Sequence, residues 1–156
     1  MLPESTRISK KALAVASSGG HWMQLLRLVP ALEDYEIVFV TVLESYRGQV
    51  PKNRFYIVPD ANRWNRLGLL ALAARMAWIM HREKPDIVIS TGAAPGYFAI
   101  LFGHFLGART IWVDSLANVK RLSLSGRLAG GHADLWLTQW PHLARTGGPF
   151  YGGAVI

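Results

Sequence analysis

Residues 11–21 read KALAVASSGGH. The stretch 11–17 is almost wholly apolar, which predicts a strand buried on both faces, and the glycines after it predict a tight turn into a helix over about 22–32. A continuous apolar strand, without alternation of polar residues, is typical of a parallel sheet covered by helices on both sides. This stretch therefore indicates an α/β fold.

The same pattern returns along the chain. Further strands are expected at 36–42, 54–58, 86–90, 109–113 and 133–138, with helices over 65–82 and about 95–106. Strands that alternate with helices predict a doubly wound, Rossmann-like parallel sheet. We find no repeat, linker or low-complexity segment, so residues 1–156 are expected to form one domain.

The net charge and the absence of cysteine limit the classes of function that this chain can have. The 156 residues include 17 basic and 10 acidic side chains, a formal charge of +7, and no cysteine. The absence of cysteine excludes disulfides and thiolate chemistry, and the charge favours nucleic acid, anionic lipid or phosphorylated substrates as partners. The polar start and the short apolar run 12–16 suit neither a secretory signal nor a membrane span, so a cytoplasmic location is expected.

The first candidate loop is Ser17-Ser18-Gly19-Gly20-His21, with Ser18, Gly19 and Gly20 as candidate phosphate-binding residues. Glycines let the backbone approach a ligand closely, and the start of a helix offers free N–H groups that suit a phosphate or diphosphate. His21 would face the same cleft. The alternative is an ordinary strand-to-helix turn with a serine N-cap. The loop is neither a GxGxxG fingerprint nor a Walker loop.

A second glycine loop follows the strand at 86–90 and reads STGAAPGY, with Thr91, Gly92 and Gly96 as candidate phosphate-binding residues. Its proline lies near the first turn of the next helix, which again opens a helix N-terminus toward the cleft. Two such loops after two parallel strands can hold one diphosphate from two sides.

The third loop reads DSLANVKR from Asp114 to Arg121. Asp114 ends a strand in a position suited to a hydroxyl or to a catalytic histidine, and Lys120 and Arg121 supply countercharge. The alternative is an aspartate turn followed by a solvated basic stretch.

The helix expected at 65–82 has large apolar side chains nearly all the way round, with arginines and tryptophans toward both ends. Such a helix suits the surface of an anionic membrane, and its apolar run is too short to span one. The candidate membrane residues are Trp64, Leu67, Leu70, Trp78 and Ile79. The alternative is burial between the sheet and a partner subunit.

Four motifs in order, ALAVASSGGH, PDIVISTGAAPGY, ARTIWVDSLANVKRLSLSGRL and ADLWLTQWPHL, resemble one family. It comprises the bacterial relatives of the membrane-anchoring subunit of the dolichol-pathway UDP-GlcNAc transferase, within the asparagine-linked-glycosylation family, among them exopolysaccharide and capsule glycosyltransferase subunits. The resemblance implies the N-terminal, acceptor-binding half of a split GT-B glycosyltransferase. A separate chain would bind the nucleotide sugar, and the acceptor would be a lipid-diphosphate-linked saccharide.

The resemblance also implies residue roles. His21 of the Gly-Gly-His loop would be the general base, and Thr91-Gly92 would lie near the lipid diphosphate. The acidic residue after the next strand is usually glutamate in that family, and here it is Asp114. Asp114 would orient the imidazole. The C-terminal tail would dock on the partner chain, and the protein would work at the inner face of the plasma membrane.

Two other functions remain open from the residues alone. A small dinucleotide-dependent oxidoreductase would share the fold and would use Glu44 to hold a ribose, but the glycine spacing is missing. A nucleic-acid-binding module is suggested by charge alone, without a basic-aromatic platform. We expect no cofactor, no metal site and no nucleic acid. The sequence does not indicate which sugar is transferred.

Overall fold

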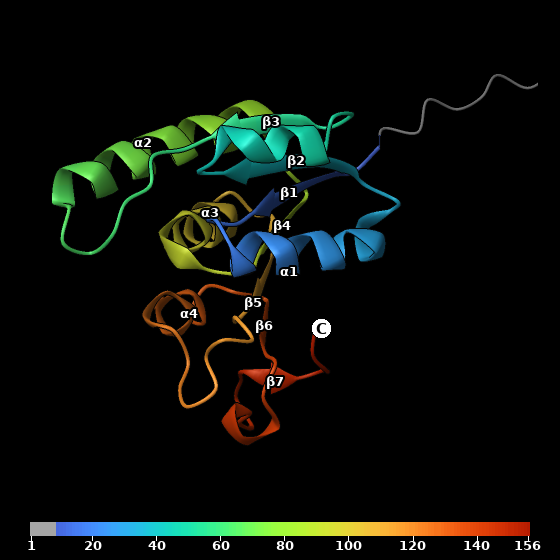
Figure 1. Ribbon diagram of the computed structural model, residues 1–156, viewed down its shortest axis with the longest axis vertical. Helices are drawn as coiled ribbons and strands as arrows, with labels where there is room; N and C mark the ends of the chain where they lie inside the picture. Colours follow the sequence, from blue (N-terminus) through green and yellow to red (C-terminus); the bar gives the residue numbers. More distant parts are fainter. Residues whose placement is uncertain (1–8) are drawn as a thin grey trace, which may run out of the picture.

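The computed structural model describes residues 9–156, so most of the basic N-terminal segment lies outside the described residues. Its strands pair in parallel into one sheet with the order β3-β2-β1-β4-β5-β6-β7 (Figure 1). The strands are β1 (Lys11–Val15), β2 (Glu36–Thr41), β3 (Arg54–Ile57), β4 (Ile87–Ser90), β5 (Arg109–Val113), β6 (Leu135–Thr138) and β7 (Phe150–Tyr151). The order of the first six strands is that of a Rossmann fold.

Helices cover both faces of this sheet. The α-helices are α1 (Gly20–Leu28), α2 (Arg66–Glu83), α3 (Ala93–Phe105) and α4 (Leu124–Ala129), and the 3-10 turns are η1 (Val29–Leu32), η2 (Glu44–Gln49) and η3 (Pro141–Leu143). In Figure 1, α1 lies on one side of β1 and β2, and α2 lies on the other side.

Strands β1 to β5 contribute alternate side chains to two cores, because successive residues of a strand point to opposite faces. From β1, Ala12 and Ala14 pack with Trp22 and other residues of α1, whereas Leu13 and Val15 pack with residues of α2 and α3. These four β1 side chains are fully buried. The continuous apolar runs therefore have the cause inferred from the sequence, and the predicted doubly wound, Rossmann-like class is confirmed.

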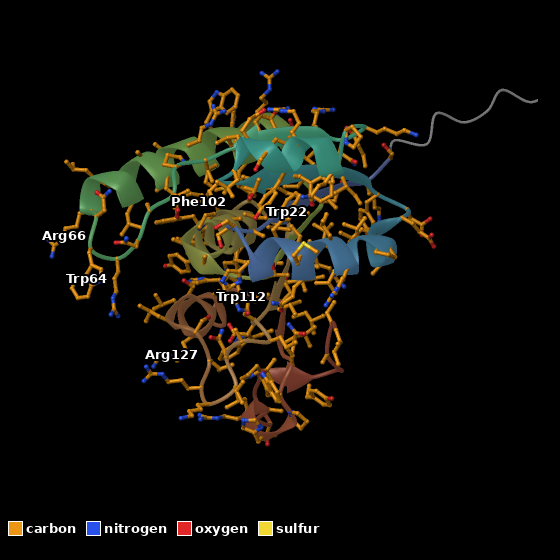
Figure 2. The ribbon with its side chains drawn as sticks, viewed as in Figure 1. Trp22, Trp64, Arg66, Phe102, Trp112 and Arg127 are labelled. Atoms are coloured by element: carbon orange, nitrogen blue, oxygen red, sulfur yellow. The ribbon has the colours of Figure 1, made fainter. Side chains whose placement is uncertain are left out.

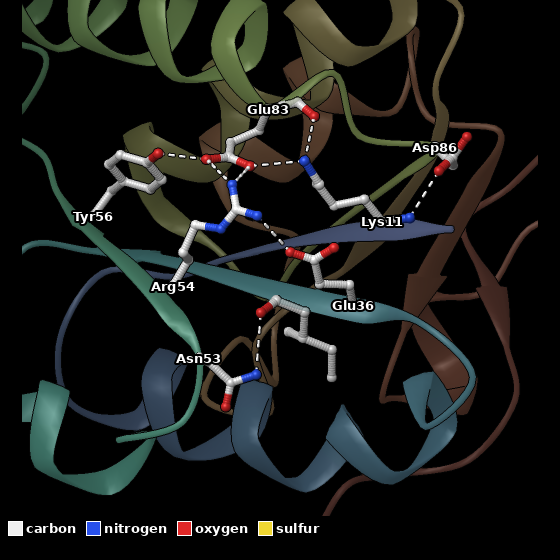
Figure 3. A network of polar contacts seen from close by, with 8 residues as sticks. Lys11, Glu36, Asn53, Arg54, Tyr56, Glu83 and Asp86 are labelled. Carbon is white, nitrogen blue, oxygen red and sulfur yellow. Dashed lines mark hydrogen bonds and ion pairs between the residues drawn. The ribbon is translucent and has the colours of Figure 1, made fainter. Parts of the chain in front are cut away.

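A buried ion network ties the end of α2 to the amino ends of the strands (Figure 3). The side chain of Glu83 is fully buried and accepts hydrogen bonds from Lys11 Nζ at 3.0 Å, Arg54 Nη1 at 2.9 Å and the Tyr56 hydroxyl. Burial raises the pKa of Glu83, but these hydrogen bonds and the two cations outweigh it and hold the pKa below its ordinary value.

The element ends differ from the sequence prediction for local reasons. The first helix ends at Leu28 and tightens into a 3-10 turn, because Pro30 has no N–H to continue it. The helix expected from about residue 95 begins at Ala93, since Pro95 is tolerated in a first turn. Helix α4 and strand β7 were not predicted.

Candidate functional site

The two glycine loops lie side by side at the switch point of the sheet. The strands β1 and β4 are parallel neighbours, with Val15 opposite Ser90 at their carboxyl ends. The strand order runs outward in opposite directions from this pair, and in open α/β sheets ligands bind beyond the carboxyl ends of the strands at such a point. The loop after each strand is one of the two predicted phosphate loops.

A pair of hydrogen bonds joins the two loops. The ring Nδ1 of His21 lies 2.9 Å from the carbonyl oxygen of Thr91, and the Thr91 hydroxyl donates to the carbonyl oxygen of His21 at 2.6 Å. The ring lies so close to Gly92 that a Cβ at that position would overlap it. The structure therefore fixes the imidazole at the junction of the loops.

This contact determines the tautomer of neutral His21. A carbonyl oxygen can only accept, so Nδ1 must carry the proton that it donates to Thr91. In the neutral ring Nε2 is then the unprotonated nitrogen, with a lone pair able to take a proton. His21 is half-buried at the carboxyl edge of the sheet. The geometry suits a general base.

Glycines stand at the N-caps of both helices. Gly19 has φ +66° and Gly92 has φ +148°, and neither α1 nor α3 has a side-chain cap. The first-turn N–H groups therefore have no partner within their own helix, and they carry the positive end of the helix dipole. Such openings suit an anion. Gly19 and Gly20 are exposed, and Ser18 is half-buried.

The second glycine loop holds the His21 residue in place. Thr91 is fully buried, and its hydroxyl donates a hydrogen bond to the carbonyl oxygen of His21. The amide of Gly92 donates to Ser90 Oγ at 3.2 Å. The Thr91 side chain thus positions the imidazole, and the predicted binding of the diphosphate at Thr91-Gly92 stays a prediction. The N–H groups left for an anion at this opening are those of Ala93 and Ala94.

Gly96 is also a structural residue. It is buried in the first turns of α3, and a Cβ there would overlap Ser90 and lie 3.2 Å from the Trp112 ring. Its missing side chain lets α3 pack closely on β4 and β5, and its role in acceptor binding stays a prediction.

Asp114 does not orient His21, which corrects the predicted catalytic role. Asp114 is 1% exposed, and its carboxylate accepts four hydrogen bonds, from Trp112 Nε1, Asn118 Nδ2, and the amide and hydroxyl of Ser123. Ser123 in turn caps α4 by accepting from the amide of Gly126 at 2.9 Å. Asp114 therefore anchors the loop between β5 and α4.

Several residues that the sequence did not single out brace the site. The amide of Gly19 donates to the Tyr46 hydroxyl at 2.9 Å, and the Tyr46 ring stacks on Trp22 with 4.8 Å between centroids. Buried Gln24 accepts from the amide of Leu116 at 3.0 Å and from Gln139 Nε2 at 2.6 Å. These contacts hold α1 against the loops after β2, β5 and β6. Lys120 and Arg121 are exposed, and their role as countercharges stays a prediction.

The predicted membrane residues divide into two groups. Trp64, Leu67, Leu70 and Trp78 are 81%, 81%, 67% and 46% exposed. Ile79 is fully buried and belongs to the stripe of α2 that packs on the sheet with Leu72, Met76 and Met80, so its assignment to a membrane surface is wrong. Within residues 9–156, no helix has both the length and the apolar character needed to span a bilayer.

Another groove lies at the opposite edge of the sheet. It has a volume of about 1000 Å³ and is lined by residues at the amino ends of the strands, among them Lys10 and Arg109. The two acidic residues of this groove stabilise neighbouring strands. Asp86 accepts a hydrogen bond from the amide of Lys11, and Asp134 accepts one from the amide of Thr110. We place the site at the carboxyl edge, where the glycine loops and His21 converge.

Comparison with known proteins identifies the family. The family model described as "Oligosaccharide biosynthesis protein Alg14 like" matches residues 66–152, more than half of the chain. The chain belongs to this family. The mouse UDP-N-acetylglucosamine transferase subunit ALG14 is 30% identical over 170 residues, which cover 88% of this chain and 78% of the relative. The subunit of the same name from Schizosaccharomyces pombe is 29% identical, with 86% and 78% covered.

Solved structures support the fold. The crystal structure of Acinetobacter baumannii MurG matches with a TM-score of 0.74 at 14% identity, covering 91% of this chain and 45% of that one. The UDP-N-acetylglucosamine 2-epimerase of Rickettsia bellii matches with a TM-score of 0.71 at 12% identity, covering 94% and 45%. The Alg14-like chain thus spans less than half of either structure.

The oxidoreductase alternative would use Glu44 to hold a ribose. In the structure this carboxylate pairs with Arg47.

Proposed function

We propose that the chain is the acceptor-binding subunit of a two-component glycosyltransferase. A separate subunit supplies the nucleotide sugar, and the enzyme transfers the sugar from UDP to a saccharide linked to a lipid diphosphate. The product serves exopolysaccharide, capsule or glycolipid biosynthesis. The relatives' name, UDP-N-acetylglucosamine transferase subunit, supports both the donor class and the need for a partner.

One observation carries this proposal, namely the hydrogen bond between His21 Nδ1 and the Thr91 carbonyl at the switch point. It brings a basic ring nitrogen beside two helix openings that suit an anion. The acceptor diphosphate lies against the amides of Gly20, His21, Ala93 and Ala94. The Nε2 of His21 takes the proton of the acceptor hydroxyl as that oxygen attacks the sugar carbon and the UDP leaves.

The rate enhancement expected from a general base fits sugar transfer to a hydroxyl. A hydroxyl is a weak nucleophile at neutral pH, and a positioned general base is typically worth about 10²–10⁴ in rate. The protonated imidazole formed in the transition state lies next to the Thr91 carbonyl, whose negative end stabilises the positive charge.

The same proposal places the protein on a membrane surface at the cytoplasmic side. Exposed Trp64, Leu67, Leu70 and Trp78 form one side of α2 and the loop before it. Guanidinium groups lie over the tryptophan rings, with Arg63 4.6 Å from Trp64 and Arg75 4.7 Å from Trp78. Apolar side chains flanked by cations suit the interface of an anionic bilayer.

Reconstitution tests the proposal. The purified chain is mixed with UDP-N-acetylglucosamine and a lipid-diphosphate saccharide, with and without a purified nucleotide-sugar subunit. Product is expected only when both subunits are present. The variant His21→Ala should form the complex normally and lose about 10²–10⁴ in turnover. Robust turnover by the single chain, or full activity of the variant complex, would reject the proposal.

A further inference from the structure

A second groove opens beside the start of α3, at the carboxyl edge of the sheet. It has a volume of about 490 Å³ and lies between the segment before α2, the first turn of α3 and the first turn of α4. Its walls include Arg63, Trp64, Ala93, Ala94, Leu124 and Ser125. None of these residues except Trp64 was singled out as a site residue from the sequence.

The groove adjoins the candidate anion site directly. Ala93 follows Gly92, is the first residue of α3, and contributes one of the free amides at that helix opening. A ligand whose diphosphate lies at these amides therefore has its next atoms at the mouth of the groove.

The lining suits a hydrocarbon chain. Trp64 is 81% exposed and Leu124 is 43% exposed, and Ala93 and Ala94 add methyl groups to the lining. Large apolar side chains exposed together indicate a surface that another apolar group covers. The one cation of the lining, Arg63, has its guanidinium over the Trp64 ring, where it can face the anionic end of a ligand.

The surface next to the groove also carries exposed apolar side chains with cations around them. Leu67 on α2 and Leu128 on α4 are 81% and 51% exposed. Figure 2 shows Trp64, Arg66 and Arg127 projecting on the side of the molecule where α2 begins. Apolar side chains with cations around them complement a ligand that is apolar at one end and anionic at the other.

We propose that this groove binds the part of the acceptor's hydrocarbon chain nearest to the diphosphate, an inference that rests on the proposed function. The diphosphate lies at the start of α3, the first chain units lie between Trp64 and Leu124, and the rest of the chain leaves toward the membrane side. The groove thereby selects acceptors by the length of their chain.

Calorimetric titration of the full chain tests this assignment with three probes, namely inorganic diphosphate, dimethylallyl diphosphate and farnesyl diphosphate. Each buried methylene contributes about fourfold in affinity, so farnesyl diphosphate should bind at least about tenfold more tightly than dimethylallyl diphosphate. The variants Trp64→Ser and Leu124→Ser should abolish most of this ratio and leave the affinity for inorganic diphosphate unchanged. The control Leu106→Ser, at an exposed position at the other end of α3, should retain the ratio.

The outcomes separate this inference from the proposed function. Equal affinity for the two prenyl diphosphates, or a ratio that both groove variants retain, overturns the chain site while binding of diphosphate leaves the anion site intact. Absence of binding by all three probes overturns both. If Leu124→Ser weakens association with the partner subunit and the ratio is unchanged, the groove is a protein contact.

Discussion

Replacement of Gly92 by alanine tests the junction of the two loops. The added Cβ would overlap the ring of His21, which must then leave the carbonyl of Thr91, 2.9 Å away. A φ of +148° also strains any residue other than glycine, at a cost of about 1–3 kcal/mol. For a chain of this size, that corresponds to a fall in Tm of roughly 2–12 °C.

The assay combines thermal unfolding with turnover of the reconstituted complex. Because the general base is displaced, turnover should fall by about 10²–10⁴ at temperatures where the variant is folded. The control is Gly131→Ala, where an added Cβ meets nothing within 4 Å. If Gly92→Ala lowers the Tm but keeps wild-type turnover, His21 is not the base. An unchanged Tm would contradict the packing of the ring against Gly92.

Three further predictions address the fold, the third loop and the membrane surface. Glu83→Gln leaves two cations facing a neutral amide and should cost about 2–3 kcal/mol at pH 7, the usual loss for a broken buried pair reduced because the Arg54 side chain is 54% exposed. Since the pKa of Glu83 is lowered in the folded state, the ionised carboxylate stabilises the fold fully above about pH 4.5, and this stabilisation is lost as the pH falls through the folded pKa. The free energies of unfolding of variant and wild type, measured in urea, should therefore converge in acid. Asp114→Asn sets an amide N–H₂ against the donors of Trp112 and Ser123 and should lower the free energy of unfolding by roughly 1–3 kcal/mol. Because Asp114 does not touch His21, turnover of the folded complex should stay near wild type. A loss of turnover as large as that of His21→Ala would restore the catalytic role of Asp114. Trp78→Ser should weaken cosedimentation with anionic vesicles by roughly tenfold, since it removes a large apolar contact, and equal binding by variant and wild type would argue against a lipid role for this side of α2.

The fold could be predicted because its signals are local. Runs such as 11–17 are apolar without alternation, and only a sheet covered on both faces has room for every side chain in them. The glycines at 19 and 92 marked the two loops of the candidate site, since both backbone conformations favour glycine. The convergence of these loops follows from the pairing of β1 with β4.

The errors arose where a role depends on contacts between distant segments. The partner of the His21 ring is a main-chain carbonyl, which every residue possesses and no motif marks. Asp114 resembled a catalytic acid, but its partners Asn118 and Ser123 are local and close its own loop. Helix α2 is apolar nearly all round, so its sequence does not show that Ile79 lies on the buried side.

Helix α4 was missed because it has only six residues, too few for a periodic pattern. Its single sequence signal is Ser123, which caps it. The groove beside it was missed with it, because Leu124 lies 60 residues along the chain from Trp64 on the opposite wall.

Titration of the isotope-labelled chain with inorganic diphosphate, followed by amide ¹H–¹⁵N correlation spectra, tests the anion site most directly. The largest shifts should fall on the amides of Gly20, His21, Ala93 and Ala94, and the His21 ring signals should move with the same Kd. Shifts confined to Lys10 and Arg109, at the opposite edge of the sheet, would contradict the proposed site.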